Sequence, residues 1–278
     1  MKKRNPIGLF DSGVGGLSVW REIVRQLPRQ DTLYVADQTH VPYGNRPLAE
    51  VRHFSEQITR FLINRGAVVI VIACNTASAA ALYELRDALP EIPFIGMEPA
   101  IKPAVKQTQT GVVGVLATPD TFQGKPYHKL MTRFAPQAHI LTQVCPSLVD
   151  IVENGALDTS QTEDQIRECL SPLLDAGIDQ LVLACTHYPF LRPLIERITG
   201  PQVQVIDPAA AIARQTARML KRLKRTSSND QIGHHTFYTS GDPARFAQTI
   251  NHLLPSLTQI PHQIRLARWQ NGQLESSN

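Results

Sequence analysis

The sequence predicts an α/β protein with two related lobes, each built on a parallel-type sheet flanked by helices. Three observations support this fold class. Short apolar runs such as VVIVIA (68–73) alternate with longer segments of helical apolar spacing, such as PLAEVRHFSEQITRFLINR (47–65). The runs are continuously apolar, which is typical of strands buried on both faces of a parallel sheet. The chain also repeats two of its motifs in the same order.

The apolar runs place the expected strands along the chain. They are 5–10, 32–36, 67–73, 92–96, 112–117, 138–144, 179–184, 203–207 and 235–240. Helical spacing predicts helices between most of them, for example 15–27 (GGLSVWREIVRQL) and 209–225 (AAAIARQTARMLKRLKR). After residue 213 we expect more helix and the one late strand, added to the first lobe. TSSNDQ (226–231) reads as a polar loop, and NGQLESSN (271–278) is expected to be disordered.

The repeated motifs define the two lobes. IGLFDSGVGG (7–16) resembles VGVLATPDTF (113–122) at an offset of 106, and the strand that ends in Cys74 resembles the one that ends in Cys185, 111 positions later. We therefore expect a first lobe of residues 1–97 and 207–278 and a second of 98–206. Because active sites of open parallel sheets lie at the carboxyl ends of the strands, the site is expected in the cleft between the lobes.

Composition excludes several classes of protein. With 42% hydrophobic and 19% charged residues among 278, the chain has the balance of a soluble globular protein. It has no apolar run long enough for a membrane span or a secretory leader, so a cytoplasmic location is expected. The net charge of +4 is mild, and the basic cluster KRLKR (221–225) ends a helix, where cations complement the dipole. No aromatic residues interleave it, so no nucleic-acid partner is expected.

Four cysteines remain to be explained. In a reducing compartment all four are expected to be thiols. Cys145 and Cys169 read as small buried hydrophobes. No pair of cysteines has C-x₂-C spacing, and His187 alone does not complete a zinc site, so no metal is expected.

Cys74 and Cys185 differ because each follows a strand and precedes a residue pair, Asn-Thr or Thr-His, at an expected helix start. Backbone N–H groups there favour a thiolate and can bind a carboxylate. Two such thiols facing one cleft suit the inversion of a carbon centre, since one removes a proton and the other delivers one to the opposite face. Asp11 and His187 could tune the pKa of the two thiols. The alternatives are that Asp11 caps a helix and that His187 is a hydrogen-bonded histidine in a loop.

Four motifs together resemble the glutamate racemase family: FDSGVGGLSV, VPYGNRP, ACNTAS and ACTHYP. The match runs from about residue 7 to TSGDPARF near residue 246, in the family's order and spacing. The resemblance implies a cofactor-independent enzyme that makes D-glutamate for peptidoglycan, with two lobes related by a pseudo-twofold axis. It also implies glutamate as the small-molecule partner; a homodimer is the default expectation.

The resemblance further implies residue roles. Cys74 would be the base for D-glutamate and Cys185 for L-glutamate, supported by Asp11 and His187 respectively. Glu153 resembles an acidic residue near the second cysteine, with Asp150 as a nearby competitor. Substrate-binding positions are implied at Asp11, Ser12, Tyr43, Gly44, Asn75, Thr76, Thr186 and His187, with Thr118 at the mirrored strand end.

Other readings stay open or are disfavoured by the residues. DSGVGGLS lacks the G-K-[ST] ending of a phosphate loop; its glycines more plausibly let backbone approach a small carboxylate. No lysine follows an apolar strand as a pyridoxal phosphate site requires, so no cofactor is expected. A racemase of aspartate or a hydantoin would share both cysteines, whereas a related decarboxylase needs one. A two-lobed binding protein needs neither.

Overall fold

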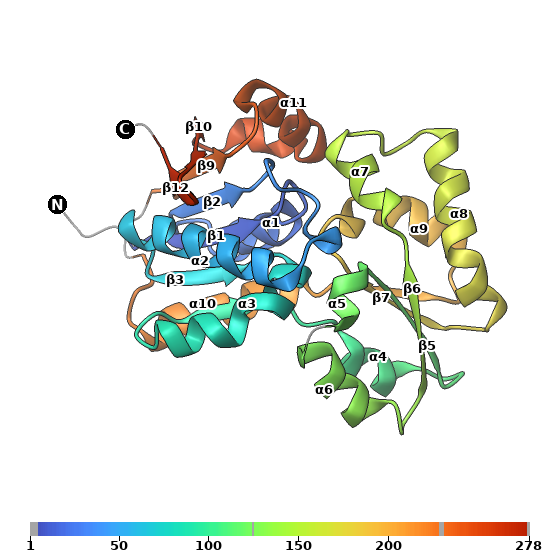
Figure 1. Cartoon of the computed structure of the whole chain (residues 1–278). Coiled ribbons are helices and arrows are strands. Elements are labelled where there is room, and N and C mark those ends of the chain that lie inside the picture. Colours follow the sequence, from blue (N-terminus) through green and yellow to red (C-terminus); the bar gives the residue numbers. More distant parts are fainter. Residues whose placement is uncertain (1–4, 124, 228–230, 277–278) are drawn as a thin grey trace.

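The first sheet contains six parallel strands, seen in blue, cyan and red in Figure 1. In the computed structural model, which describes residues 5–123, 125–227 and 231–276, their order is β10-β9-β2-β1-β3-β4. The bounds are β1 Ile7–Asp11, β2 Thr32–Ala36, β3 Val69–Ile72, β4 Phe94–Gly96, β9 His235–Thr239 and β10 His262–Leu266. β1, β3 and β9 are buried along their whole length, as expected for central strands of a parallel sheet.

The second sheet contains four parallel strands in the order β6-β5-β7-β8. They are β5 Val112–Ala117, β6 His139–Val144, β7 Gln180–Ala184 and β8 Gln204–Ile206. The strands of residues 7–96 and of 112–206 therefore repeat one order, in which the first strand lies between the second and the third. Gly8 pairs with Ile70 in the first sheet, and Gly114 pairs with Leu181 in the second, so the two sequence offsets of 106 and 111 reflect equivalent strand pairs.

Helices flank both sheets (Figure 1). Their bounds are α1 Leu17–Gln26, α2 Leu48–Asn64, α3 Asn75–Ala88, α4 Ile101–Gln107, α5 Pro119–Gln123, α6 Lys125–Phe134, α7 Ser147–Glu153, α8 Ser160–Asp175, α9 Arg192–Thr199, α10 Ala209–Arg222 and α11 Pro243–Leu253, with 3₁₀ turns η1 Tyr43–Asn45, η2 Tyr188–Leu191 and η3 Pro255–Gln259. Side-chain caps begin three of them in the described part of the chain: Cys74 accepts from Ala77 N before α3, Thr159 from Thr162 N before α8 and Asp242 from Ala244 N before α11. Lys221 and Arg222 lie in the last turn of α10, as the sequence predicts. No helix of the described ranges is both long and apolar enough to cross a bilayer.

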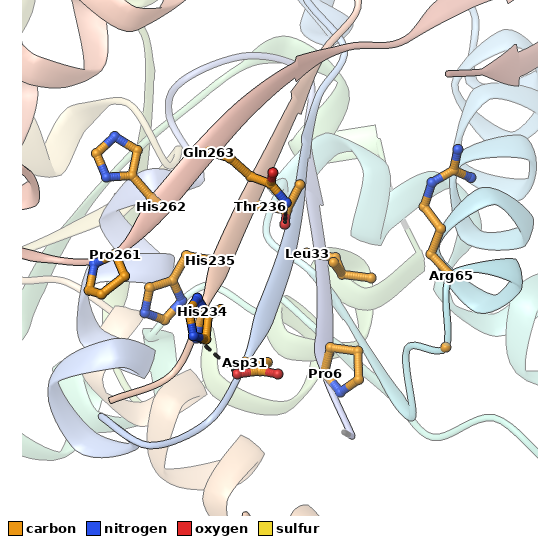
Figure 2. Close-up of a pocket in the computed structure, with 11 residues that line it drawn as sticks. Pro6, Asp31, Leu33, Arg65, His234, His235, Thr236, Pro261, His262 and Gln263 are labelled. Atoms are coloured by element: carbon orange, nitrogen blue, oxygen red, sulfur yellow. Dashed lines mark hydrogen bonds between the residues drawn. The ribbon is translucent and has the colours of Figure 1, made fainter. Parts of the chain in front are cut away.

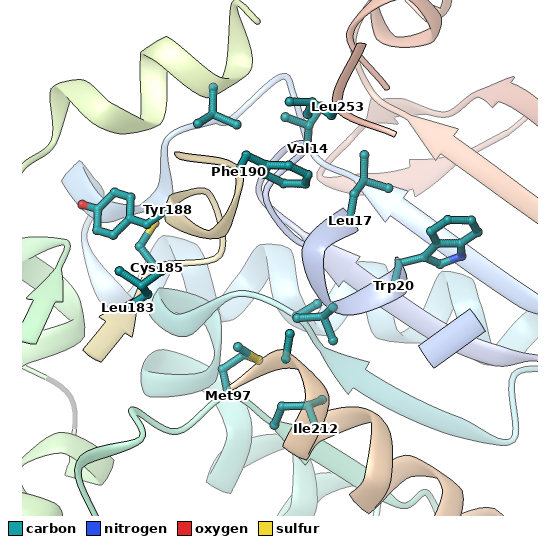
Figure 3. Close-up of a cluster of buried hydrophobic side chains, with 14 of the residues drawn as sticks. Val14, Leu17, Trp20, Met97, Leu183, Cys185, Tyr188, Phe190, Ile212 and Leu253 are labelled. Atoms are coloured by element: carbon teal, nitrogen blue, oxygen red, sulfur yellow. The ribbon is translucent and has the colours of Figure 1, made fainter. Parts of the chain in front are cut away.

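The largest cluster of buried side chains crosses from one sheet to the other. Figure 3 shows Trp20 of α1, Met97 after β4, Leu183 of β7 and Ile212 of α10 in this cluster, to which Cys185 also belongs. Burying a side chain of this size stabilises a fold by about 1.5–3 kcal/mol, so this shared core holds the strand that carries Cys185 against the first sheet. The lobe boundaries at residues 97 and 206 stay a prediction.

The C-terminal region corrects two predictions. Beyond residue 213 the chain supplies two strands to the first sheet, β9 and β10, rather than one. The segment 271–278 is not wholly disordered, because β12 (Gln273–Glu275) pairs antiparallel with β11 (Arg268–Gln270) in a hairpin. These strands are short and mostly polar, and their pairing depends on packing against α2 that sequence periodicity does not reveal. Of the expected loop 226–231, residues 228–230 lie outside the described part of the chain.

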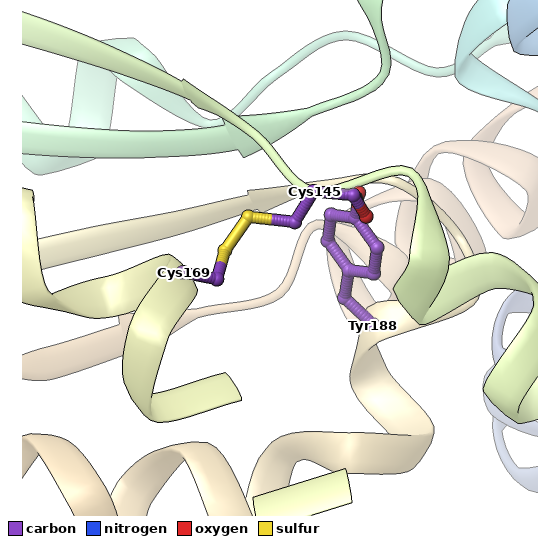
Figure 4. The surroundings of a disulfide bond; sticks show 3 residues. All are labelled: Cys145, Cys169 and Tyr188. Carbon is purple, nitrogen blue, oxygen red and sulfur yellow. Dashed lines mark hydrogen bonds between the residues drawn. A yellow bond between two sulfur atoms is a disulfide. The ribbon is translucent and has the colours of Figure 1, made fainter. Parts of the chain in front are cut away.

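The prediction that all four cysteines are thiols is wrong for Cys145 and Cys169. These two form a disulfide, with Cα atoms 6.2 Å apart (Figure 4). Cys145 follows β6, and Cys169 lies on α8, which packs along that strand. The fold thereby joins two residues whose spacing gave no sign of pairing. Cys74 and Cys185 are free and buried.

Candidate active site

A small cavity lies at the carboxyl ends of β1, β3, β5 and β7, where the two sheets face each other. It encloses about 20 Å³. Its lining residues are Ser12, Pro42, Tyr43, Gly44, Cys74, Asn75, Thr76, Thr118, Val149, Cys185, Thr186 and His187. The structure therefore brings the predicted site residues of both lobes together, apart from Asp11 and Glu153, which lie behind the wall.

Cys74 stands between β3 and α3 on the first lobe's side of the cavity. It is the N-cap of α3, and its Sγ accepts a hydrogen bond from Ala77 N at 3.4 Å. Burial, and then the negative charge of Asp11, raise the pKa of Cys74 well above its usual 9.0. At neutral pH this sulfur is therefore a thiol that can donate a proton.

Cys185 follows β7 and lies next to a histidine–carboxylate pair. Its Sγ is 3.7 Å from Nδ1 of His187, and Nε2 of His187 is 2.7 Å from Oε1 of Glu153. Burial would lower the pKa of His187, but its contacts with Cys185 and Glu153 hold that pKa well above the usual 6.5. Burial likewise opposes charge on Glu153, yet the hydrogen bond and charge of His187 bring the pKa of Glu153 below 4.5. A protonated imidazole thus lies beside the sulfur of Cys185.

The glycine-rich turn after β1 makes room for this pair. Val14 N donates to Oε1 of Glu153 at 2.8 Å. A Cβ added at Gly13 would overlap the Glu153 carboxylate, and one added at Gly15 would overlap the His187 ring. The glycine-rich turn thus approaches a carboxylate closely, and this carboxylate is the side chain of Glu153.

Asp11 ends β1 and is fully buried behind the cavity. It accepts hydrogen bonds from Gly13 N at 3.1 Å and from Thr186 Oγ1 at 3.2 Å. Burial raises the pKa of Asp11, and the charge of His187 partly offsets that rise. Asp11 does not cap α1, whose N-cap is Gly16, so the capping interpretation does not apply.

The remaining lining residues supply polar groups to the cavity. Thr76 Oγ1 and Thr118 Oγ1 are 3.0 Å apart, so they join the first lobe's wall to the second's. Asn75 is 4% exposed, and neither polar atom of its side-chain amide has a hydrogen-bond partner among the described residues. A buried amide without partners is costly unless a ligand completes it, so Asn75 is suited to binding a small polar molecule.

Two features were not predicted from the sequence. Val149, on α7, lines the cavity, and no sequence pattern indicates it. Pro42 also lines it and lies within the VPYGNRP motif, which could have identified it. Between the two acidic candidates on α7, Glu153 reaches His187, whereas Asp150 is exposed.

Glu153→Gln should lower the melting temperature most between about pH 4.5 and 6.5. His187, with a raised pKa, contributes stability that is complete below 6.5 and is lost as pH rises through its folded-state value. Glu153, with a lowered pKa, contributes stability above 4.5 that is lost as pH falls through its folded-state value. Removing the charged partner should cost roughly 1–3 kcal/mol in that window.

Thermal unfolding followed across the pH range checks this expectation. Asp150→Asn is the matched control, because it removes an exposed carboxylate from the same helix and should not change the pH profile. Superimposable profiles for the wild type and Glu153→Gln would contradict the charged pair.

A larger cavity of about 510 Å³ lies at the opposite end of the first sheet (Figure 2). Asp31, His234 and Pro261 lie at the amino ends of its strands and line this cavity. It contains neither free cysteine and lies away from the carboxyl ends, where parallel sheets bind ligands. Within the described residues no group of three or more His, Cys, Asp or Glu side chains is arranged to hold a metal ion.

Known proteins are similar to this chain in sequence and in fold. A profile of the Asp/Glu/hydantoin racemase family matches residues 7–216. A glutamate racemase from Roseiflexus sp. is 48% identical over 249 residues, which cover 89% of this chain and 92% of that protein. A glutamate racemase structure from Bacillus anthracis is similar with a TM-score of 0.86 at 34% identity, covering 98% of this chain and 99% of that one. A structure from Francisella tularensis, in complex with D-glutamate, has a TM-score of 0.81 at 30% identity and covers 96% and 98% of the two chains. The chain therefore belongs to the Asp/Glu/hydantoin racemase family.

Proposed function

We propose that this protein interconverts L- and D-glutamate by acid–base chemistry at Cys74 and Cys185. One observation carries the proposal: the two free thiols line one cavity, each at the carboxyl end of an equivalent strand in the two repeated sheets. Similar proteins named glutamate racemase cover most of the chain, which supports glutamate as the substrate.

The proposed reaction moves one proton off the α-carbon and another onto it. One sulfur, as thiolate, takes the Cα proton, so that an S–H bond forms and the electron pair of the C–H bond stays on carbon. The other sulfur, as thiol, then gives its proton to the opposite face. Before substrate binds, the thiol form of Cys74 and the imidazolium of His187 beside Cys185 suit Cys185 as base and Cys74 as acid. The resemblance assigns that direction to L-glutamate.

Polar groups around the cavity suit an amino acid with two carboxylates. Asn75, with its unpartnered amide, and the backbone of Tyr43–Gly44 would bind the substrate together with the hydroxyls of Ser12, Thr76, Thr118 and Thr186. A cavity of about 20 Å³ holds about one water molecule, so the walls must separate for glutamate to enter. Asp11 and Glu153 would act through Thr186 and His187 rather than by touching substrate.

Circular dichroism of each enantiomer in turn tests the function. Protein treated with EDTA in pyridoxal-free buffer should bring either L- or D-glutamate to the racemic mixture, with negligible turnover of aspartate. Racemisation of aspartate but not glutamate would favour the alternative substrate. Unchanged optical signals for both acids would favour a binding protein.

The cellular setting is also proposed. The product D-glutamate would serve peptidoglycan synthesis, and the cytoplasm is the proposed compartment because the two site thiols must stay reduced. A homodimer stays a prediction that analytical ultracentrifugation can test.

A further inference from the structure

We propose that Trp269, in the C-terminal hairpin, is a positioning residue for the active site. Trp269 donates a hydrogen bond to the buried carboxylate of Asp37, and that carboxylate in turn fixes the position of the turn that contains Tyr43 and Gly44. The proposal rests on the proposed racemase function, because its main measurement is the turnover of glutamate.

Asp37 follows β2 and is fully buried, yet no basic residue forms an ion pair with it apart from His40 within the described ranges. Its carboxylate is held by polar groups from four places in the chain. Oδ1 accepts from Trp269 Nε1 at 2.7 Å and from Ser240 Oγ at 2.8 Å. Oδ2 accepts from Tyr43 OH at 2.7 Å and lies 2.9 Å from His40 Nδ1. A buried carboxylate is costly unless such partners surround it, so each one helps to fix its position.

The bond from Tyr43 links this carboxylate to the cavity. Tyr43 begins the 3₁₀ turn η1, and both Tyr43 and Gly44 line the cavity. The hydrogen bond from the Tyr43 hydroxyl to Asp37 therefore holds this part of the cavity wall. Gly44 lies against Thr118 of the facing wall, where an added Cβ would come within 2.8 Å of the Thr118 Cβ. Because the two walls are this close, a small shift of Tyr43 changes the space available to substrate.

The hairpin holds Trp269 in place by packing and hydrogen bonding. Its ring meets His40 edge-on at 5.0 Å between centroids and Phe54 at 5.4 Å, and His40 stacks on Phe54 at 3.9 Å. Gly272 O, at the tip of the hairpin, is 3.0 Å from Nε2 of His53 on α2. Leu274 is 6% exposed and belongs to the same buried cluster as Tyr43 and Cys74. A segment 232 residues from Asp37 therefore supports the wall beside the first cysteine.

The test is Trp269→Phe, which keeps an aromatic ring and removes the N–H donor. Loss of one hydrogen bond to a charged group that keeps its other donors should raise KM for glutamate by about 3- to 10-fold and change kcat by less than about twofold. Trp20→Phe is the matched control. Its indole also donates one hydrogen bond, to Thr32 Oγ1 at 2.9 Å, but from a buried ring in the core cluster, which does not include Asp37. It should lower the melting temperature and leave KM unchanged.

A double variant shows whether the effect passes through Tyr43. In a Tyr43→Phe background, which lacks the bond to Asp37, Trp269→Phe should raise KM no further. An equal rise in both backgrounds, or an unchanged KM in Trp269→Phe, would overturn the proposal. Wild-type protein that fails to turn over glutamate would instead count against the proposed function.

Fluorescence provides a readout that needs no folded Trp269 variant. The chain has two tryptophans, so Trp20→Phe leaves Trp269 as the sole tryptophan, which excitation at a wavelength that tyrosine does not absorb observes alone. Its emission should change saturably on titration with glutamate, because Trp269 and the cavity-lining Tyr43 both donate hydrogen bonds to Asp37. Emission that stays constant up to concentrations that saturate turnover would overturn the coupling.

Discussion

Cys74→Ala and Cys185→Ala should each abolish racemisation in both directions. Inversion needs an acid on one face of the α-carbon and a base on the other, and either variant lacks one of them. The loss should reach or exceed the roughly 10²–10⁴-fold that a positioned proton-transfer group contributes. The two enantiomers have equal free energies, so the Haldane relation requires kcat/KM to fall by the same factor for L- and D-glutamate.

The other two cysteines, Cys145 and Cys169, provide the matched control. A Cys145→Ala and Cys169→Ala double variant removes the disulfide, which costs about 2–4 kcal/mol of stability. Below its melting temperature it should keep kcat/KM within about threefold of wild type. Wild-type turnover by either single variant, Cys74→Ala or Cys185→Ala, would contradict the roles proposed for these thiols.

His187→Asn should lower kcat by about 10²-fold or more while changing KM much less. The imidazolium lies 3.7 Å from Cys185 and is held by Glu153, so its loss removes the positive charge next to the sulfur proposed to exchange a proton with the substrate. An asparagine retains hydrogen bonding but carries no charge. Initial rates over a range of concentrations of each enantiomer separate kcat from KM.

The control for this variant is His139→Asn, which changes an exposed histidine at the start of β6. Its kinetics should match the wild type. If His187→Asn kept the wild-type kcat, His187 would be a packing residue and the charge beside Cys185 would have no part in the reaction.

Sequence periodicity and the internal repeat predict the strands up to β9 and the place of both free cysteines, but not β10 or the β11–β12 hairpin. Cys74 and Cys185 were found because strand ends of a parallel sheet gather at one edge, and that rule needs no side-chain detail. The same repeat places Thr118 at the mirrored strand end, and in the structure its Oγ1 lies 3.0 Å from that of Thr76. The predicted family is confirmed by the relatives that cover most of the chain.

The disulfide, the C-terminal hairpin and the contacts of Asp37 depend on tertiary packing that the sequence does not reveal. Cys145 and Cys169 meet because α8 packs along β6, and no spacing rule anticipates that crossing. The hairpin of 268–275 pairs because Trp269 and Leu274 find an apolar surface on the first lobe, although the surrounding residues are polar. Asp37 is an isolated acidic residue after a strand and carries no sequence signal, since two of its hydrogen-bond donors lie more than 200 residues away in the chain.

Deuterium labelling in heavy water tests the two-thiol mechanism most directly. Each enantiomer should be deprotonated by one sulfur and reprotonated by the other, which has exchanged its proton with solvent. During early turnover of L-glutamate, the D-glutamate formed should therefore carry deuterium at Cα and the remaining L-glutamate almost none. The same asymmetry should hold when D-glutamate is the substrate. Near-equal labelling of substrate and product would show one base serving both faces and would contradict the account.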